Sequence, residues 1–96
     1  MNIEIQVAVS KYMPERSLYY WSKMYSSQIK KNDSHSSLKK CIAINILDYK
    51  FLPINQVHTQ FHLIEDNTGY KITNVIELHF IELKKLDNLE NLKDKN

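Results

Sequence analysis

The residues whose types and spacing most suggest chemistry are Glu4 and Gln6, which flank Ile5 near the start of the sequence. Residues 2–9 alternate between polar and apolar side chains, and this period of two predicts a β-strand with Glu4 and Gln6 on one face. A carboxylate beside a second polar group can hold Mg²⁺ and orient an attacking water, as in a metal-assisted phosphodiesterase. The alternative is an edge strand with an ordinary solvated face, because such alternation is common in antiparallel sheets.

A second candidate site is a set of histidines. We expect His58 and His62 on the same face of a later strand, with His79 opposite His62 across a hairpin. Paired histidines can bind Zn²⁺, but the sequence offers no clear third ligand. A polar sheet face is the alternative interpretation.

Aromatic side chains are concentrated between residues 12 and 25. They are Tyr12, Tyr19, Tyr20, Trp21 and Tyr25. Aromatic rings can stack on nucleic-acid bases. Helical spacing favours core packing instead for Trp21 and Tyr25.

These aromatic residues fall in a predicted helix that opens at residues 12–15, where Pro14 suits the first helical turn. Residues that recur at three- and four-residue steps are predicted to face the core, and they are Leu18, Trp21, Tyr25 and Ile29. A polar loop is expected over residues 32–37.

The later part of the chain predicts three strands. Residues 41–47 are almost continuously apolar, which predicts a strand in the middle of a sheet and covered on both faces. The order strand, helix, strand predicts a right-handed βαβ crossover. Residues 58–65 and 76–83 predict a hairpin, because residues 66–69 have turn chemistry. Residues 86–96 predict a polar tail or short helix with leucines at three-residue steps.

Composition limits the class of protein. The chain has 96 residues, of which 43% are hydrophobic and 25% charged, as in one small soluble domain. No apolar run approaches the roughly 18 residues that a membrane span needs. The lone cysteine, Cys41, lies in an apolar run and is predicted to be buried, which suggests a reducing, cytoplasmic setting.

Charge by itself does not indicate a partner. The formal net charge of +2 is too small to argue for nucleic acid. Lysine pairs at residues 30–31, 39–40 and 84–85 either form a phosphate-facing surface or are solvated ends of elements.

Four segments together resemble a known family, and they are residues 2–6, 16–25, 44–48 and 77–83. In order and spacing they resemble the recombination-promoting nuclease and transposase family, a branch of the PD-(D/E)XK nucleases. The resemblance implies an α/β fold: a restriction-endonuclease-like core with a mixed sheet of about four strands and one long helix. It also implies Mg²⁺-dependent endonucleolytic cleavage of DNA, linked to recombination or transposition.

The resemblance also implies roles for individual residues. Glu4 matches the acidic residue of the family motif and would be a metal ligand, with the backbone carbonyl of Ile5 as a second ligand. Gln6 stands in the position of the lysine, where it can orient water or donate to a phosphate oxygen but carries no charge. The helix after the motif strand lies beside the site in this family, so its side chains could reach a DNA phosphate; the candidates are Arg16, Tyr19 and Tyr20.

One part of the family pattern is missing. The pattern needs an aspartate on the hairpin before the motif strand, whereas here the motif begins almost at Met1. We therefore expect residues 1–85 to be a partial, C-terminal piece of the nuclease domain that is inactive alone. Glu15 and Asp48 are candidate substitutes for the aspartate. The alternatives are a module that pairs with a full-length relative and modulates it, and a homo-oligomer in which a partner chain supplies the aspartate.

Overall fold

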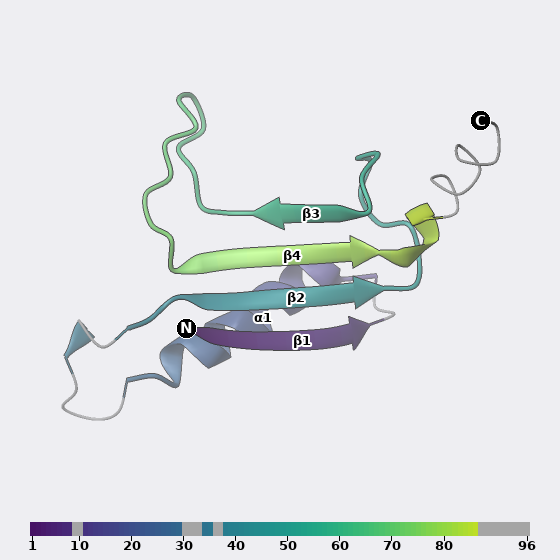
Figure 1. Ribbon diagram of the computed structural model, residues 1–96. Helices are drawn as coiled ribbons and strands as arrows, with labels where there is room; N and C mark the ends of the chain where they lie inside the picture. Colours follow the sequence, from purple (N-terminus) through teal and green to yellow (C-terminus); the bar gives the residue numbers. More distant parts are fainter. Residues whose placement is uncertain (9–10, 30–33, 36–37, 87–96) are drawn as a thin grey trace.

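The computed structural model describes residues 1–8, 11–29, 34–35 and 38–86. Its elements are β1 (Asn2–Ala8), α1 (Met13–Ser26), β2 (Cys41–Leu47), β3 (His58–Phe61), β4 (Ile76–Glu82) and a 3₁₀ turn (Leu83–Lys85). The strands form one mixed sheet in the order β1-β2-β4-β3 (Figure 1). The predicted α/β fold, with one helix and a mixed four-stranded sheet, is confirmed.

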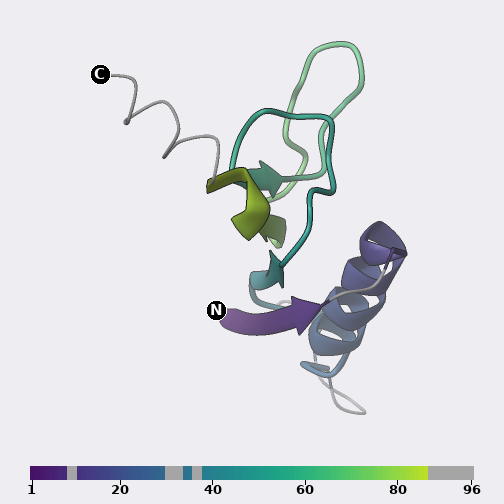
Figure 2. The same cartoon turned by 90° about the vertical axis from the view of Figure 1, so that its right-hand side faces the viewer.

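The first half of the chain is a βαβ unit. β1 and β2 run parallel, so their connection must cross the sheet, and α1 makes that crossing. The helix lies on one side of the sheet, as the edge-on view shows (Figure 2). No helix in the described residues is long and apolar enough to cross a membrane.

The helix stripe that meets the sheet departs from the predicted one at Leu18, while Trp21, Tyr25 and Ile29 are half-buried. Met13 and Ser17 are fully buried, whereas Leu18, predicted to face the core, is 44% exposed. The reason is a polar contact: Asn45 of β2 donates a hydrogen bond to the Ser17 hydroxyl, with its Nδ2 at 2.9 Å from Oγ. This contact fixes the rotation of the helix and turns Leu18 outward.

The core lies between the helix and the inner strands. Met13, Leu47 and Phe80 form its buried centre, and Tyr49, Phe51 and Leu78 pack against it. Cys41 is also buried, as predicted, and burial raises the pKa of its thiol.

The second face of the sheet carries exposed apolar side chains. On β1 these are Ile3, Ile5 and Val7, with exposed fractions of 51%, 63% and 78%. On β2 the outward residues are half-buried, and they are Ile42, Ile44 and Ile46. β2 is central, as predicted, but within the described residues the prediction of full cover on both its faces is wrong.

The antiparallel pairing of β3 with β4 is confirmed, although β3 is shorter than predicted. It ends at Phe61, and beyond it the chain forms a projecting arm with one isolated bridge between Ile64 and Lys71. At the tip, the Glu65 carboxylate accepts two backbone hydrogen bonds, and Gly69 takes a φ of 74°. The predicted turn is therefore present, but it closes this arm and not the β3–β4 pair.

A buried ion pair anchors the segment between β2 and β3. Glu82 is fully buried, and its carboxylate lies 2.8 Å from the Lys85 ammonium. The ammonium also donates to the carbonyls of Leu52 and Ile54, at 3.0 and 2.5 Å, and Glu82 accepts from the Phe51 amide. Burial opposes ionisation of Glu82, but these hydrogen bonds outweigh it and lower the pKa.

Candidate functional site

Glu4 and Gln6 lie on the face of the sheet that α1 covers. In the parallel register Glu4 is opposite Ala43, and Gln6 is opposite Asn45, which contacts the helix. Glu4 and Gln6 are half-buried there.

The placement of Glu4 and Gln6 bears on the alternative interpretation of β1 as an edge strand with an ordinary solvated face. β1 is an outer strand of the described sheet, but its polar side chains face the helix layer and its apolar ones face outward. An edge strand with an ordinary solvated face would show the opposite polarity. Glu4 and Gln6 therefore do not lie on the more exposed face of β1.

Two oxygen groups of β1 are available to a ligand. The Glu4 carboxylate makes no hydrogen bond or ion pair with the described residues. The Asn2 amide donates to the Lys40 carbonyl at 2.9 Å, so even-numbered residues of β1 direct their backbone groups toward β2. The Ile5 carbonyl consequently points to the opposite edge, where no described strand lies.

These donors fit Mg²⁺ in type, but they supply only part of a coordination shell. Carboxylate and carbonyl oxygens are the ligands that Mg²⁺ prefers. The described residues hold no group of three or more histidine, cysteine, aspartate or glutamate side chains placed for a metal. Asp48 pairs with Lys84 at 3.7 Å and stands five positions beyond Ala43, about 16 Å along the strand from the level of Glu4. Glu15 is exposed in the first turn of α1.

The predicted DNA-contacting residues form a cation–aromatic cluster on α1. The Arg16 guanidinium lies 5.1 Å from the centre of the Tyr20 ring, and the Lys23 ammonium lies 5.5 Å from that of Tyr19. The two rings meet edge to face at 5.2 Å. Arg16, Tyr19 and Lys23 are exposed. Cations and rings on one surface can contact phosphates and bases, although cation–π packing alone would also hold them together.

Trp21 and Tyr25 serve packing, in line with the alternative favoured above. Their rings are half-buried and stack at 4.7 Å. The Trp21 indole also donates to the Cys41 carbonyl at 2.8 Å, which ties α1 to β2.

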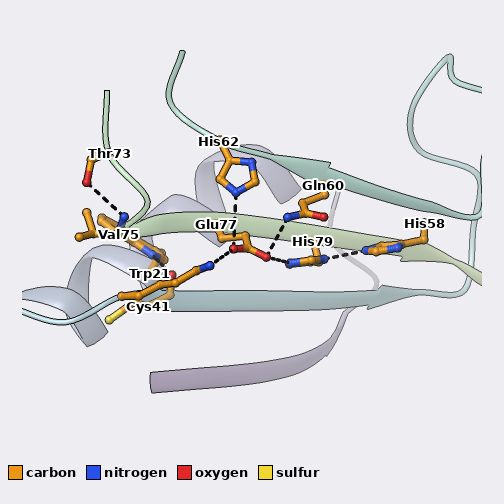
Figure 3. Close-up of polar contacts among 10 residues, drawn as sticks. Trp21, Cys41, His58, Gln60, His62, Thr73, Val75, Glu77 and His79 are labelled. Atoms are coloured by element: carbon orange, nitrogen blue, oxygen red, sulfur yellow. Dashed lines mark hydrogen bonds and ion pairs between the residues drawn. The ribbon is translucent and has the colours of Figure 1, made fainter. Parts of the chain in front are cut away.

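The most heavily bonded side chain on the outward face of the sheet is Glu77 (Figure 3). Its carboxylate contacts Lys40 and His79, each at 2.6 Å, and Gln60 at 2.9 Å, while His62 lies 3.5 Å away. The hydrogen bond from Lys40, with help from His79, outweighs burial and lowers the pKa of Glu77 to about 2. Glu77 is therefore an anion held among basic and amide side chains.

The histidines are arranged differently from the prediction. His79 lies opposite Gln60 and not opposite His62, because β3 pairs with β4 in another register. Since an ionised carboxylate only accepts hydrogen bonds, His79 donates its Nε2 proton to Glu77. Its other nitrogen, Nδ1, is 2.6 Å from Nε2 of His58. These contacts match the polar-face interpretation.

Sequence reasoning missed two residues, Asn45 and Glu77. Asn45 is a single amide within the apolar strand at residues 41–47, and Glu77 shares a strand face with His79. The sequence signal that could have identified them is a lone polar residue at a strand position expected to be buried, because buried polar groups nearly always have hydrogen-bond partners.

Comparisons with known proteins identify the family. A scan against family models matched residues 1–96 to the PD-(D/E)XK nuclease family transposase model. Searches of curated proteins and of solved structures gave no match. The match covers the whole printed sequence, and the mixed sheet with its crossing helix is consistent with a PD-(D/E)XK core. The chain therefore belongs to the PD-(D/E)XK nuclease family transposases.

Proposed function

We propose that this chain forms part of a Mg²⁺-dependent DNA endonuclease linked to recombination or transposition, with Glu4 as the metal-binding carboxylate. The observation that carries the proposal is the polarity of β1. Its carboxylate and amide are held on the helix side while three β-branched side chains face outward, so packing alone does not explain them. Family membership supports nuclease chemistry at this strand.

Each residue of the proposed site has a separate role. The Glu4 carboxylate and the Ile5 carbonyl hold the metal, which when bound supplies charge stabilisation at the scissile phosphate. Gln6 orients the attacking water. Arg16, Tyr19 and Tyr20 hold the DNA backbone beside the site, because phosphate contacts position the duplex.

The chain alone is proposed to be inactive. The described residues hold no cluster of three or more metal-binding side chains, while Mg²⁺ is usually held by one or two carboxylates together with substrate phosphates and waters. We propose that a second carboxylate comes from another segment or from a partner chain.

Magnesium titration of the purified chain tests Glu4. Backbone amide NMR signals at residues 4–6 are expected to shift with Mg²⁺ in the wild type, because the ligands lie there. The shifts are expected to vanish in Glu4→Gln, which keeps the shape of the side chain but removes its charge. Asp66→Asn, an exposed change in the turn after β3, is the matched control and should leave the response intact.

Plasmid cleavage tests activity in the same preparations. No Mg²⁺-dependent nicking is expected from the chain alone. Nicking that is lost in Glu4→Ala would contradict the proposed inactivity and point to a carboxylate from a second copy. The absence of any Mg²⁺ response at residues 4–6 would overturn the proposed metal site.

A second candidate is an interaction module that pairs with a full-length relative and modulates it. The open edge of β1 and the exposed Ile3, Ile5 and Val7 favour it, because such edges and patches recruit partners. Co-elution with an intact family nuclease in size-exclusion chromatography is then expected. Two species that elute independently would remove this candidate.

A further inference from the structure

Two buried amide atoms on neighbouring strands lack hydrogen-bond partners within the described residues. They are Nε2 of Gln6 and Oδ1 of Asn45. The two residues are register partners on β1 and β2, so their side chains leave the same face of adjacent parallel strands, about 4.8 Å apart at the backbone. One atom is a donor and the other an acceptor. The two atoms are therefore complementary.

The orientation of the Asn45 amide is set by its other contacts. Its Nδ2 lies 3.1 Å from the His79 backbone carbonyl, which can only accept a hydrogen bond. The Nδ2 group must therefore face β4, and it also reaches the Ser17 hydroxyl at 2.9 Å. Because the amide is planar, Oδ1 turns away from β4, toward the side where β1 and Gln6 lie.

The same reasoning sets the orientation of Gln6. An acceptor beside it requires its NH₂ group, so Nε2 is the end that points inward. Gln6 is half-buried as a residue, and with Nε2 buried its Oε1 is the end nearer to solvent. Asn45, by contrast, is fully buried, so neither end of its amide faces solvent.

The two atoms are not hydrogen-bonded to each other in the structure. We propose that a side-chain rotation of Gln6 brings its Nε2 within hydrogen-bond distance of Asn45 Oδ1, so that Asn45 is a positioning residue that holds Gln6 Oε1 beside Glu4. This inference rests on the proposed function and deepens it. Where the family motif has lysine, a donor, this chain presents an acceptor oxygen. Gln6 then orients a water by accepting a hydrogen bond from it, and it does not donate to a phosphate.

Side-chain hydrogen exchange tests the contact directly, without metal or substrate. The side-chain amide protons of Gln6 are assigned by the loss of their signals in Gln6→Met. They are expected to exchange at least about tenfold more slowly than those of Gln56, which lies in an exposed loop. Equal exchange rates for Gln6 and Gln56 in the wild type would overturn the proposal, whatever any variant does.

Two variants separate positioning from general support of the fold. Asn45→Leu keeps the branched shape of the side chain but removes the acceptor, so Gln6 exchange should rise to within about twofold of Gln56 while backbone amide protection in β2 persists. Ser17→Ala removes one partner of Asn45 but leaves the His79 carbonyl, and Gln6 protection should remain. Should Asn45→Leu fail to fold, Asn45→Ala also removes the acceptor and is expected to speed Gln6 exchange; slow Gln6 exchange that persists there contradicts the proposal.

The link to the metal has its own readout. Mg²⁺ is expected to shift the Gln6 side-chain carbonyl carbon in the wild type and not in Asn45→Leu. Glu4→Gln should abolish that shift and leave the slow exchange of Gln6 unchanged. Slow exchange without any Mg²⁺ response would support the Asn45–Gln6 contact and overturn the metal site, so the two failures are distinguishable.

Discussion

Replacing Lys85 with methionine is expected to lower the free energy of unfolding by about 3–5 kcal/mol. The change removes one partner of a buried pair and leaves the Glu82 carboxylate, which is fully buried, without its counter-ion. It also removes the donor that serves the carbonyls of Leu52 and Ile54. Methionine matches the length of the aliphatic stem, so the loss reports on the charge and its hydrogen bonds.

The neighbouring lysine provides the control for this experiment. Lys84 pairs with Asp48 at 3.7 Å, and both side chains are more than half exposed, at 55% and 66%. Lys84→Met is therefore expected to cost less than about 1 kcal/mol. Urea unfolding followed by the fluorescence of Trp21, the one tryptophan in the sequence, measures both variants. Equal costs for the two variants would show that burial does not strengthen the Glu82–Lys85 pair.

A double variant separates the stability cost of the unpaired buried charge from the cost of lost packing. Glu82→Gln combined with Lys85→Met removes both charges but keeps an oxygen that can accept from the amides of Phe51 and Leu52. The double variant is expected to recover more than half of the stability lost in Lys85→Met. No recovery would indicate that the hydrogen bonds from Lys85 to the two carbonyls matter more than the buried charge.

The architecture was predictable from the sequence because it follows from local periodicity. The period-two segment at β1, the apolar run at β2 and the proline-initiated helix each carry their own signal. The parallel pairing of β1 and β2 follows from the helix between them. The extent of β3 did not follow, because alternation continues after Phe61 while the pairing with β4 stops.

The rotation of the helix could not be predicted from hydrophobicity. Leu18 fits an apolar stripe with Trp21 and Tyr25, yet Ser17 takes the buried position. The Ser17–Asn45 hydrogen bond joins residues 28 positions apart, and nothing local to either residue reveals it. Buried polar pairs depend on topology, so they emerge only when the strands and helix are in place.

The candidate site was predictable in its residues more than in its environment. The sequence places Glu4 and Gln6 on one strand face, but only the register shows that this face is the helix side and that Asn45 stands beside Gln6. Likewise, the sequence points to His58, His62 and His79, but the carboxylate that His62 and His79 contact is Glu77, which is found only once the β3–β4 pairing is known.

Acid is expected to destabilise the chain through Glu77. Its pKa in the folded state is about 2, below the ordinary value of 4.5, because Lys40 and then His79 bond its carboxylate. A lowered folded pKa gives stability that is fully present above about pH 4.5 and is lost as the pH falls toward 2. The full difference corresponds to about 3 kcal/mol at most, and the 37% exposure of Lys40 reduces this to about 1–3 kcal/mol.

The two variants that test this titration are both expected to flatten the pH profile. Glu77→Gln is expected to be less stable at pH 7, with a stability that changes less than the wild type between pH 4.5 and 2. Lys40→Met removes the strongest cause of the lowered pKa, so the acid loss should be smaller and should be complete at a higher pH than in the wild type. Glu82, whose pKa is also lowered, contributes a residual slope of the same sign in every variant. Urea unfolding at each pH measures the slopes, and an unchanged slope in Glu77→Gln would assign the acid sensitivity to Glu82 and to exposed carboxylates such as Glu65 instead.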